Sequence, residues 1–101
     1  MKKINTIPDE WQNIAQLFIA LGDAHRQRIL LAFDKDERLN ILQIAAASTL
    51  SRTAVTHHLK ILHQSGALQS EKVGKEVFFW VNKSLMTNAI KGVLKYIEAE
   101  I

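Results

Sequence analysis

The sequence predicts a mainly α-helical domain with one small β-hairpin. Its 101 residues suffice for about one domain with a single hydrophobic core. One proline and four glycines leave too few turns for an all-β sandwich, which needs a turn signal about every ten residues. Apolar residues make up 48% of the chain, and most of them recur at helical spacing. We therefore expect one helix-rich domain over residues 1–101.

The composition also excludes several classes of protein. The chain has no cysteine, which removes disulfides, thiolate nucleophiles and cysteine-ligated zinc. No run of about 18 apolar residues occurs, so we expect no membrane partner. Residues 1–9 lack the apolar stretch of a signal peptide, so a cytoplasmic location is expected. Paired carboxylates, a glycine-rich phosphate loop and a nucleophile beside a base are all missing, so we expect no catalytic residues, no cofactor and no enzyme.

Positive charge is concentrated in the second half of the chain. The formal net charge is +3, with six Lys and Arg against six Asp and Glu in residues 1–50 and seven against four in residues 51–101. A basic half indicates an anionic partner, either nucleic acid or a membrane surface.

The first helix is expected over residues 9–21. Asp9 and Gln12 have the spacing of a capping box, and Gly22 follows the last helical residue. The apolar positions that recur at helical spacing are Trp11, Ile14, Phe18 and Leu21.

The second and third helices are expected over residues 24–33 and 41–47. Asp23 and Asn40 stand directly before them and suit the capping position. Two arginines fall on the outward side of the second helix, Arg26 and Arg28.

The fourth helix is expected over residues 52–64, after a break of about three residues. Ser51 is a good N-cap, and Gly66 suits the left-handed residue that ends a helix. Its inward positions follow the i, i+4, i+7 rule and are Val55, Leu59 and Leu62.

A hairpin and a last helix complete the chain. The extended segments are expected over residues 67–72 and 76–81, since the second is β-branched and aromatic and a glycine lies between them. The last helix is expected over residues 84–99. Its apolar stripe is too broad for a terminal helix on a small core, which suggests burial against a partner subunit. The stripe consists of Leu85, Ala89, Ile90, Val93, Leu94, Ile97 and Ile101.

This order of elements predicts a winged helix-turn-helix. The helix-turn-helix would span about residues 40–65 and the wing about residues 67–81. The second helix of such a motif lies in the DNA major groove and reads base edges near its N-terminus. Val55 and Leu59 would anchor that helix inward. The residues on the opposite side of the helical wheel are Arg52, Thr53, Thr56 and His57.

Three stretches make the chain similar to the ArsR/SmtB-type winged-helix regulators. They are LGDAHRQRIL at residues 21–30, LSRTAVTHHLKIL at residues 50–62, and SGAL at residues 65–68 followed by the Gly74-Lys75 wing. The resemblance covers about residues 9–99. It implies a dimeric bacterial DNA-binding regulator, usually a repressor released by an effector, with a palindromic operator in double-stranded DNA.

The resemblance also implies which residues meet DNA. Arg52 could donate two hydrogen bonds to guanine, whereas His58 matches a recurrent histidine that we interpret as scaffold. Thr49 stands where the family commonly has glycine, which suggests a different turn or slight strain. The expected DNA-binding set is Ser51, Arg52, Thr53, Thr56, His57, Lys60 and Lys75, with Lys72 a weaker phosphate candidate. The plainer alternatives are that Arg52 is merely solvated and that Lys72 pairs with Glu71 or Glu76 across the hairpin.

A homodimer is expected to form through the helices at residues 9–21 and 84–99. The residues expected at its interface are Trp11, Phe18, Leu85, Val93, Leu94 and Ile97.

No metal site is expected from the resemblance. The positions of the family's Cys-x-Cys motif hold Asn40 and Leu42, neither of which replaces a thiolate. Residues 82–101 contain no Asp and no His, so the family's second metal site is missing too. The effector stays unknown. The alternatives are a winged helix that binds another protein and a repressor that responds to a metal or small ligand through a site without cysteine.

Overall fold

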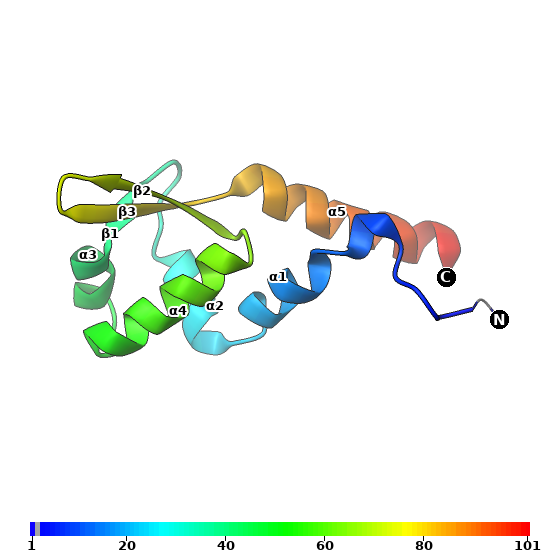
Figure 1. The fold of residues 1–101 in the computed structure, drawn as a ribbon, viewed down its shortest axis with the longest axis horizontal. Coiled ribbons are helices and arrows are strands. Elements are labelled where there is room, and N and C mark those ends of the chain that lie inside the picture. The colour runs from blue at the N-terminus through cyan, green and yellow to red at the C-terminus, as the bar shows by residue number, and fades with distance from the viewer. Residues whose placement is uncertain (2) are drawn as a thin grey trace.

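A computed structural model describes residue 1 and residues 3–101, with the side chain of Glu10 outside that description. The predicted fold class is confirmed, because helices dominate and one small antiparallel sheet accompanies them (Figure 1). The elements in chain order are the 3-10 helix η1 (Asp9–Trp11), α1 (Ile14–Leu21), α2 (Ala24–Leu31), β1 (Leu39–Asn40), α3 (Ile41–Ala46), α4 (Arg52–Gln64), β2 (Leu68–Val73), β3 (Glu76–Val81) and α5 (Lys83–Glu100).

One buried cluster of side chains connects the four helices α1, α2, α3 and α4 with the sheet. Helix α4 contributes its whole inward face to it, so the orientation of α4 is fixed by packing on several neighbours. The buried members of the cluster are Leu17, Ala20, Ile29, Ile44, Val55, Leu59, Leu62, Ala67, Leu68 and Phe79.

The sheet has three strands where the sequence predicted two. Strand β3 lies in the middle, with β1 and β2 antiparallel on either side of it. Leu39 pairs with Phe79 and Asn40 with Phe78, so β1 ties the start of α3 to the wing. A strand of two residues has no alternation pattern of its own, which is why the sequence did not predict it.

The predicted helix at residues 9–21 is wrong as a continuous element. It is divided into η1 and α1, and the capping box is not formed, because Pro8 takes the N-cap position and no side chain caps η1. Because the helix is divided, its two parts pack against different elements. Leu17 of α1 is buried in the core, while Trp11 of η1 packs edge-on against Tyr96 of α5 with ring centroids 5.4 Å apart.

The starts of α2, α3 and α4 lie where the sequence placed them, and α5 begins at Lys83, one residue earlier than expected. Asp23 Oδ1 accepts hydrogen bonds from the backbone N–H groups of His25 and Arg26 at the start of α2. Asn40 and Gln43 form a capping box on α3. Helices α2 and α3 end at Leu31 and Ala46, slightly earlier than expected.

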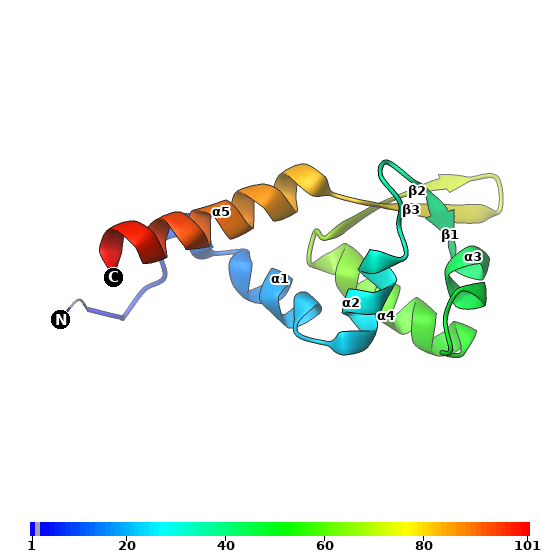
Figure 2. The same cartoon turned by 180° about the vertical axis from the view of Figure 1, so that it is seen from behind.

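Helix α5 extends away from the body and makes the molecule elongated, with extents of 51 × 23 × 20 Å (Figures 1 and 2). Both termini lie at the far end of α5, opposite the tip of the wing. Asn82 alone separates β3 from α5: its backbone N–H donates to the carbonyl of Ala67 at 2.9 Å, and its side chain accepts from the N–H of Leu85 at 3.3 Å. No helix in the described part of the chain combines the length and apolarity needed to cross a bilayer.

Candidate nucleic-acid interface

Helix α4 has the bounds that the sequence predicted, and both of its ends are specified locally. Ser51 Oγ accepts a hydrogen bond from the N–H of Ala54 at 3.1 Å, which satisfies one of the free donors at the helix start. Gly66 adopts a left-handed conformation with φ of 85° just beyond the other end. Val55 and Leu59 are buried, so the opposite face of α4 is fixed toward the outside.

The outward face of α4 is polar and cationic over its first two turns. Thr56 Oγ1 donates to the carbonyl oxygen of Arg52 at 2.8 Å. Its oxygen can still accept a hydrogen bond from an outside partner, and its methyl group can make an apolar contact. The expected DNA-facing residues of this helix are all exposed: Arg52, Thr53, Thr56, His57 and Lys60.

The tip of the wing and the start of α4 border the same surface depression, with the start of α3 between them. Val73 pairs with Glu76, which leaves Gly74 and Lys75 as a two-residue turn, and Gly74 has φ of 62°. Arg52 and Lys75 line the same surface depression of about 120 Å³. The fold therefore brings together two cations that lie 23 positions apart in the sequence.

Glu76 also lines this depression, but it accepts from Asn40 Nδ2 at 3.3 Å and forms no ion pair with these cations among the described side chains. Arg52, Lys60 and Lys75 make no ion pair with any side chain that the structure describes. The suggested pairing of Lys72 with Glu71 or Glu76 is wrong, because Glu71 pairs with Arg38 at 2.7 Å and Glu76 Oε1 accepts from Asn40 Nδ2 at 3.3 Å. The surface that combines α4 and the wing tip is suited to a polyanion.

His57 and His58 are neighbours in sequence but occupy different surroundings. His57 is exposed, whereas His58 is half-buried, and Arg26 Nη1 lies 3.3 Å from His58 Nδ1. Burial lowers the pKa of His58, with the carboxylate of Asp23 acting in the opposite direction. His58 thus belongs to the scaffold, as the sequence indicated.

The prediction that Arg26 faces outward is wrong. Arg26 Nε donates to the carbonyl oxygen of Ala20 at 2.8 Å, and its Nη2 donates to that of Ile19 at 3.0 Å. Gln27 Nε2 donates to the carbonyl oxygen of Leu21 at 2.6 Å. These side chains donate to the last carbonyls of α1, where a helix leaves acceptors without helical partners. The carbonyl of Ile19 also accepts from the backbone N–H of Gly22 at 3.2 Å. Helical spacing alone could not show that those carbonyls lie within reach of α2.

The turn at Thr49 carries no left-handed strain. Asp36 is the only described residue other than glycine with a positive φ, so the expected difficulty at Thr49 does not arise. The N–H of Leu50 donates to Ser48 Oγ at 2.9 Å, which closes the turn through a side chain.

The apolar face expected at a subunit interface is only partly covered. Phe18, Leu94 and Ile97 are 45%, 52% and 48% exposed, and no residue of α5 is fully buried. Trp11 and Val93 are half-buried. Leu85 is 37% exposed, and its methyl groups lie against Gly66 of the same chain.

The structure gives no cluster of metal-ligating residues. Among the side chains that it describes, no three His, Cys, Asp or Glu residues form a group that could hold a metal ion. Asp23 and His25 lie two positions apart, but the Asp23 carboxylate caps α2 by accepting from backbone N–H groups.

Comparisons with known proteins agree with this geometry. A family model described as winged helix-turn-helix DNA-binding matches residues 23–69. A transcriptional repressor SmtB homolog from Synechocystis sp. is 30% identical over 90 residues, which cover 89% of this chain and 67% of the relative. The transcriptional repressor SdpR of Bacillus subtilis is 26% identical over 81 residues, 80% of this chain and 89% of the relative.

Solved structures extend the similarity to the whole fold. An ArsR-like transcriptional regulator from Rhodococcus sp. RHA1 superposes with a TM-score of 0.77 and 28% identity, covering 89% of this chain and 81% of that one. This match is longer than that of the family model, which is limited to residues 23–69.

Proposed function

Because the chain belongs to the ArsR/SmtB family of winged-helix DNA-binding transcriptional regulators, we propose that it is a homodimeric repressor that binds a palindromic operator without a metal ion. The relatives are regulators of transcription and not enzymes. Because a regulator of transcription acts on DNA inside the cell, we also propose a cytoplasmic location. We further propose that residues 1–101 form one winged-helix unit.

The observation that carries the proposal is the cationic start of α4 beside the wing tip. Arg52 and Lys75 line one depression and lack an ion pair among the described side chains. A recognition helix presents its N-terminal residues to base edges, while a wing contacts the flanking backbone. In this arrangement Arg52 reads guanine O6 and N7, and Lys75 binds phosphate.

The remaining residues of the surface fit supporting roles. Thr53 and Thr56 reach phosphate or a thymine methyl group, and His57 lies beside them. Lys60 is placed for a phosphate farther along the groove. Ser51 caps α4, and the helix start it stabilises favours a phosphate oxygen.

A second copy of the chain would cover the apolar side chains of α1 and α5. Exposed apolar groups on both helices are more than a monomer of this size needs at its surface. Two copies related by a dyad would place two α4 helices about one helical turn of DNA apart. The residues proposed at this interface are Trp11, Phe18, Leu85, Val93, Leu94 and Ile97.

Metal independence follows from the donor set of the chain itself. The sequence has no cysteine, and the described histidines and carboxylates form no cluster. We expect DNA affinity to be unchanged by a chelator such as EDTA. A calorimetric titration that gives stoichiometric, sub-micromolar zinc binding, together with weaker DNA binding, would contradict this part.

The test of the main proposal is selection of bound duplexes from a random pool. We expect a palindromic consensus whose half-sites are about one helical turn apart. Binding to that duplex should fall steeply with salt, because released counterions drive phosphate contacts. A consensus without dyad symmetry would refute the dimeric reading, and absence of duplex binding at about 50 mM salt would favour a protein partner for the surface.

A further inference from the structure

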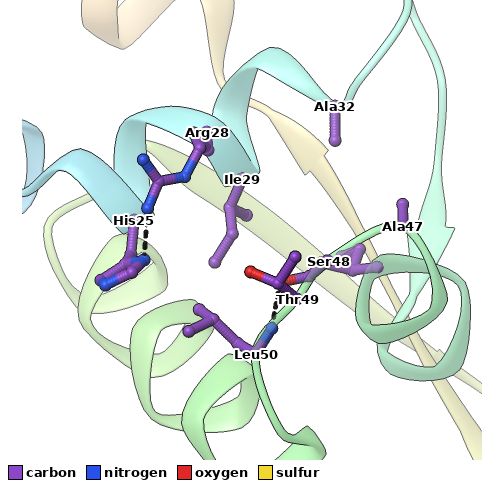
Figure 3. Close-up of a pocket in the computed structure, with 9 residues that line it drawn as sticks. His25, Arg28, Ile29, Ala32, Ala47, Ser48, Thr49 and Leu50 are labelled. Atoms are coloured by element: carbon purple, nitrogen blue, oxygen red, sulfur yellow. Dashed lines mark hydrogen bonds between the residues drawn. The ribbon is translucent and has the colours of Figure 1, made fainter.

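A cavity of about 140 Å³ lies between α2, α3 and the turn that leads into α4 (Figure 3). None of the residues assigned to DNA or to the subunit interface lines it. Figure 3 shows residues of α2 on one side and the turn at residues 48–50 on the other. Its lining consists of His25, Arg28, Ile29, Ala32, Ile44, Ala47, Ser48, Thr49 and Leu50.

The rim of this cavity carries an uncompensated positive charge. No acidic residue lines it, and Arg28 makes no ion pair with any side chain that the structure describes. Arg28 Nη2 lies 2.6 Å from His25 Nδ1. A guanidinium can only donate, so His25 Nδ1 accepts and the ring hydrogen lies on Nε2. The guanidinium is therefore oriented by a hydrogen bond to a ring nitrogen and not by a carboxylate, which leaves its charge available.

The other polar groups of the rim are hydrogen-bond donors. Ser48 Oγ accepts from the N–H of Leu50, and its own hydroxyl hydrogen is left to donate. Thr49 adds an exposed hydroxyl. A cation accompanied by donors is the environment that an anionic oxygen group prefers.

The floor of the cavity is apolar. Ile29 and Ile44 are 3% and 2% exposed, and Leu50 closes the side next to α4. A dry cavity of about 150 Å³ accommodates a molecule as large as benzene. An inorganic anion would leave such a floor empty, whereas a short alkyl chain would fill it.

We propose that this cavity binds a small monocarboxylate with a short alkyl chain, of about the size of butyrate. The carboxylate lies against Arg28 and the hydroxyls of Ser48 and Thr49. The alkyl chain packs on Ile29 and Leu50. The site stands independently of DNA binding, although its ligand would touch the turn that leads into α4.

The experiment is an NMR titration of the whole chain with sodium butyrate in the absence of DNA. We expect saturable shifts of the backbone amides of residues 47–50 and of Arg28. Butyramide has the same shape without the charge and should bind at least about tenfold more weakly, since hydrogen bonds to charged groups are the stronger ones. Equal binding of butyramide, or shifts that do not saturate, would overturn the proposal.

Two variants and one control make the result specific. Arg28→Gln should weaken butyrate binding about tenfold or more, and Thr49→Val should weaken it without changing the shape of the rim. Arg38→Gln removes an arginine remote from the cavity and should leave butyrate binding unchanged. Retained affinity in Arg28→Gln, with thermal unfolding like that of the unchanged protein, would overturn the proposal.

DNA phosphate is the competing source of an anionic oxygen. Arg28→Gln should leave DNA affinity and its salt dependence unchanged. If that variant instead loses DNA affinity while butyrate fails to bind, Arg28 contacts the DNA backbone and the proposal is wrong. If the unchanged protein binds butyrate but no duplex, the site stands and the proposed function fails.

Discussion

Arg52 is the residue on which base reading depends most in the proposed complex. It is exposed at the first position of α4 and shares a depression with Lys75. We expect Arg52→Ala to cost about 1–3 kcal/mol of specific binding and to relax one base position. Fluorescence anisotropy on the selected duplex and on random DNA measures this. Lys60→Ala is the matched control, and should weaken both duplexes equally and reduce the salt slope by about 1.

An equal loss on both duplexes for Arg52→Ala would make this arginine a phosphate contact. The plainer interpretation, that Arg52 is merely solvated, predicts no loss on either duplex.

Arg26 stabilises the fold rather than the DNA complex. It donates to two carbonyl oxygens at the end of α1 and contacts His58 of α4. Arg26→Ala removes the side-chain donor to Ala20 and one of the two donors to Ile19, which keeps the N–H of Gly22. We therefore expect it to lower the free energy of unfolding by about 1–3 kcal/mol. Urea denaturation measures the loss. Arg28→Ala is the control. Arg28 lies two positions farther along α2 and is exposed, so its removal should change stability by less than about 0.5 kcal/mol.

His58 makes stability depend on pH. Burial lowers its pKa in the folded protein, Arg26, His57 and His25 act in the same direction, and Asp23 opposes them. The unfolded chain therefore binds a proton more readily, starting near the ordinary value of 6.5. The contribution of neutral His58 is fully present above that pH and is lost as pH falls below it.

Urea denaturation midpoints measured from about pH 7.5 to about pH 5, a range that spans the ordinary histidine pKa, would check this dependence. We expect His58→Gln to flatten the decline on the acidic side. An identical decline in both proteins would assign the dependence to other groups.

At the scale of elements, Gly66 couples the end of α4 to the start of α5. Its φ is 85°, and a Cβ built there would lie 2.8 Å from Leu85 Cδ1. We expect Gly66→Ala to lower stability by at least about 1–2 kcal/mol, from backbone strain alone. Gly92→Ala is the control, because nothing lies within 4 Å of a Cβ there. Inside a helix that change should raise stability by about 0.5–1 kcal/mol. Thermal unfolding of both variants tests the pair.

The same scale shows which elements a sequence can specify. Helix α4 was predicted with its bounds, because Ser51 and Gly66 are local signals at its two ends. The division of the first helix was not, since it depends on Trp11 reaching Tyr96, which lies 85 positions away. Strand β1 likewise exists only through its pairing with β3.

Some features of the candidate site could likewise be predicted from the sequence, and others could not. The exposed polar face of α4 could be predicted, because the spacing of Val55 and Leu59 decides which side faces inward. The proximity of Arg52 to Lys75 could not, since it requires the wing to be anchored next to α3 by β1. The pairing of Glu71 with Arg38 also arises from the fold and left Lys72 without the partner that the hairpin suggested.

At the scale of the whole molecule, the proposed dimer depends on α5. Leu94 is 52% exposed near the middle of its apolar stripe. We expect Leu94→Lys to give a monomer that keeps its fold but loses cooperative binding to the palindrome, because a charge there would be buried without a partner. Sedimentation equilibrium measures the mass.

The matched control is Leu31→Lys, since Leu31 is 82% exposed on α2, outside the proposed interface. It should leave the dimer intact. A dimer that survives Leu94→Lys would place the subunit contact elsewhere.

The junction at Asn82 has a mechanical consequence. One residue connects the central strand of the sheet to an 18-residue helix, and that residue is held by its backbone to Ala67 and by its side chain to Leu85. A junction this short and hydrogen-bonded is stiff, so α5 and the base of the wing move together as one rigid unit. Any change in the angle at which two copies of α5 cross would be transmitted to the hairpin tip and Lys75. In the proposed dimer, the pairing of the helices at the opposite end of the molecule would then set the distance between the two wings.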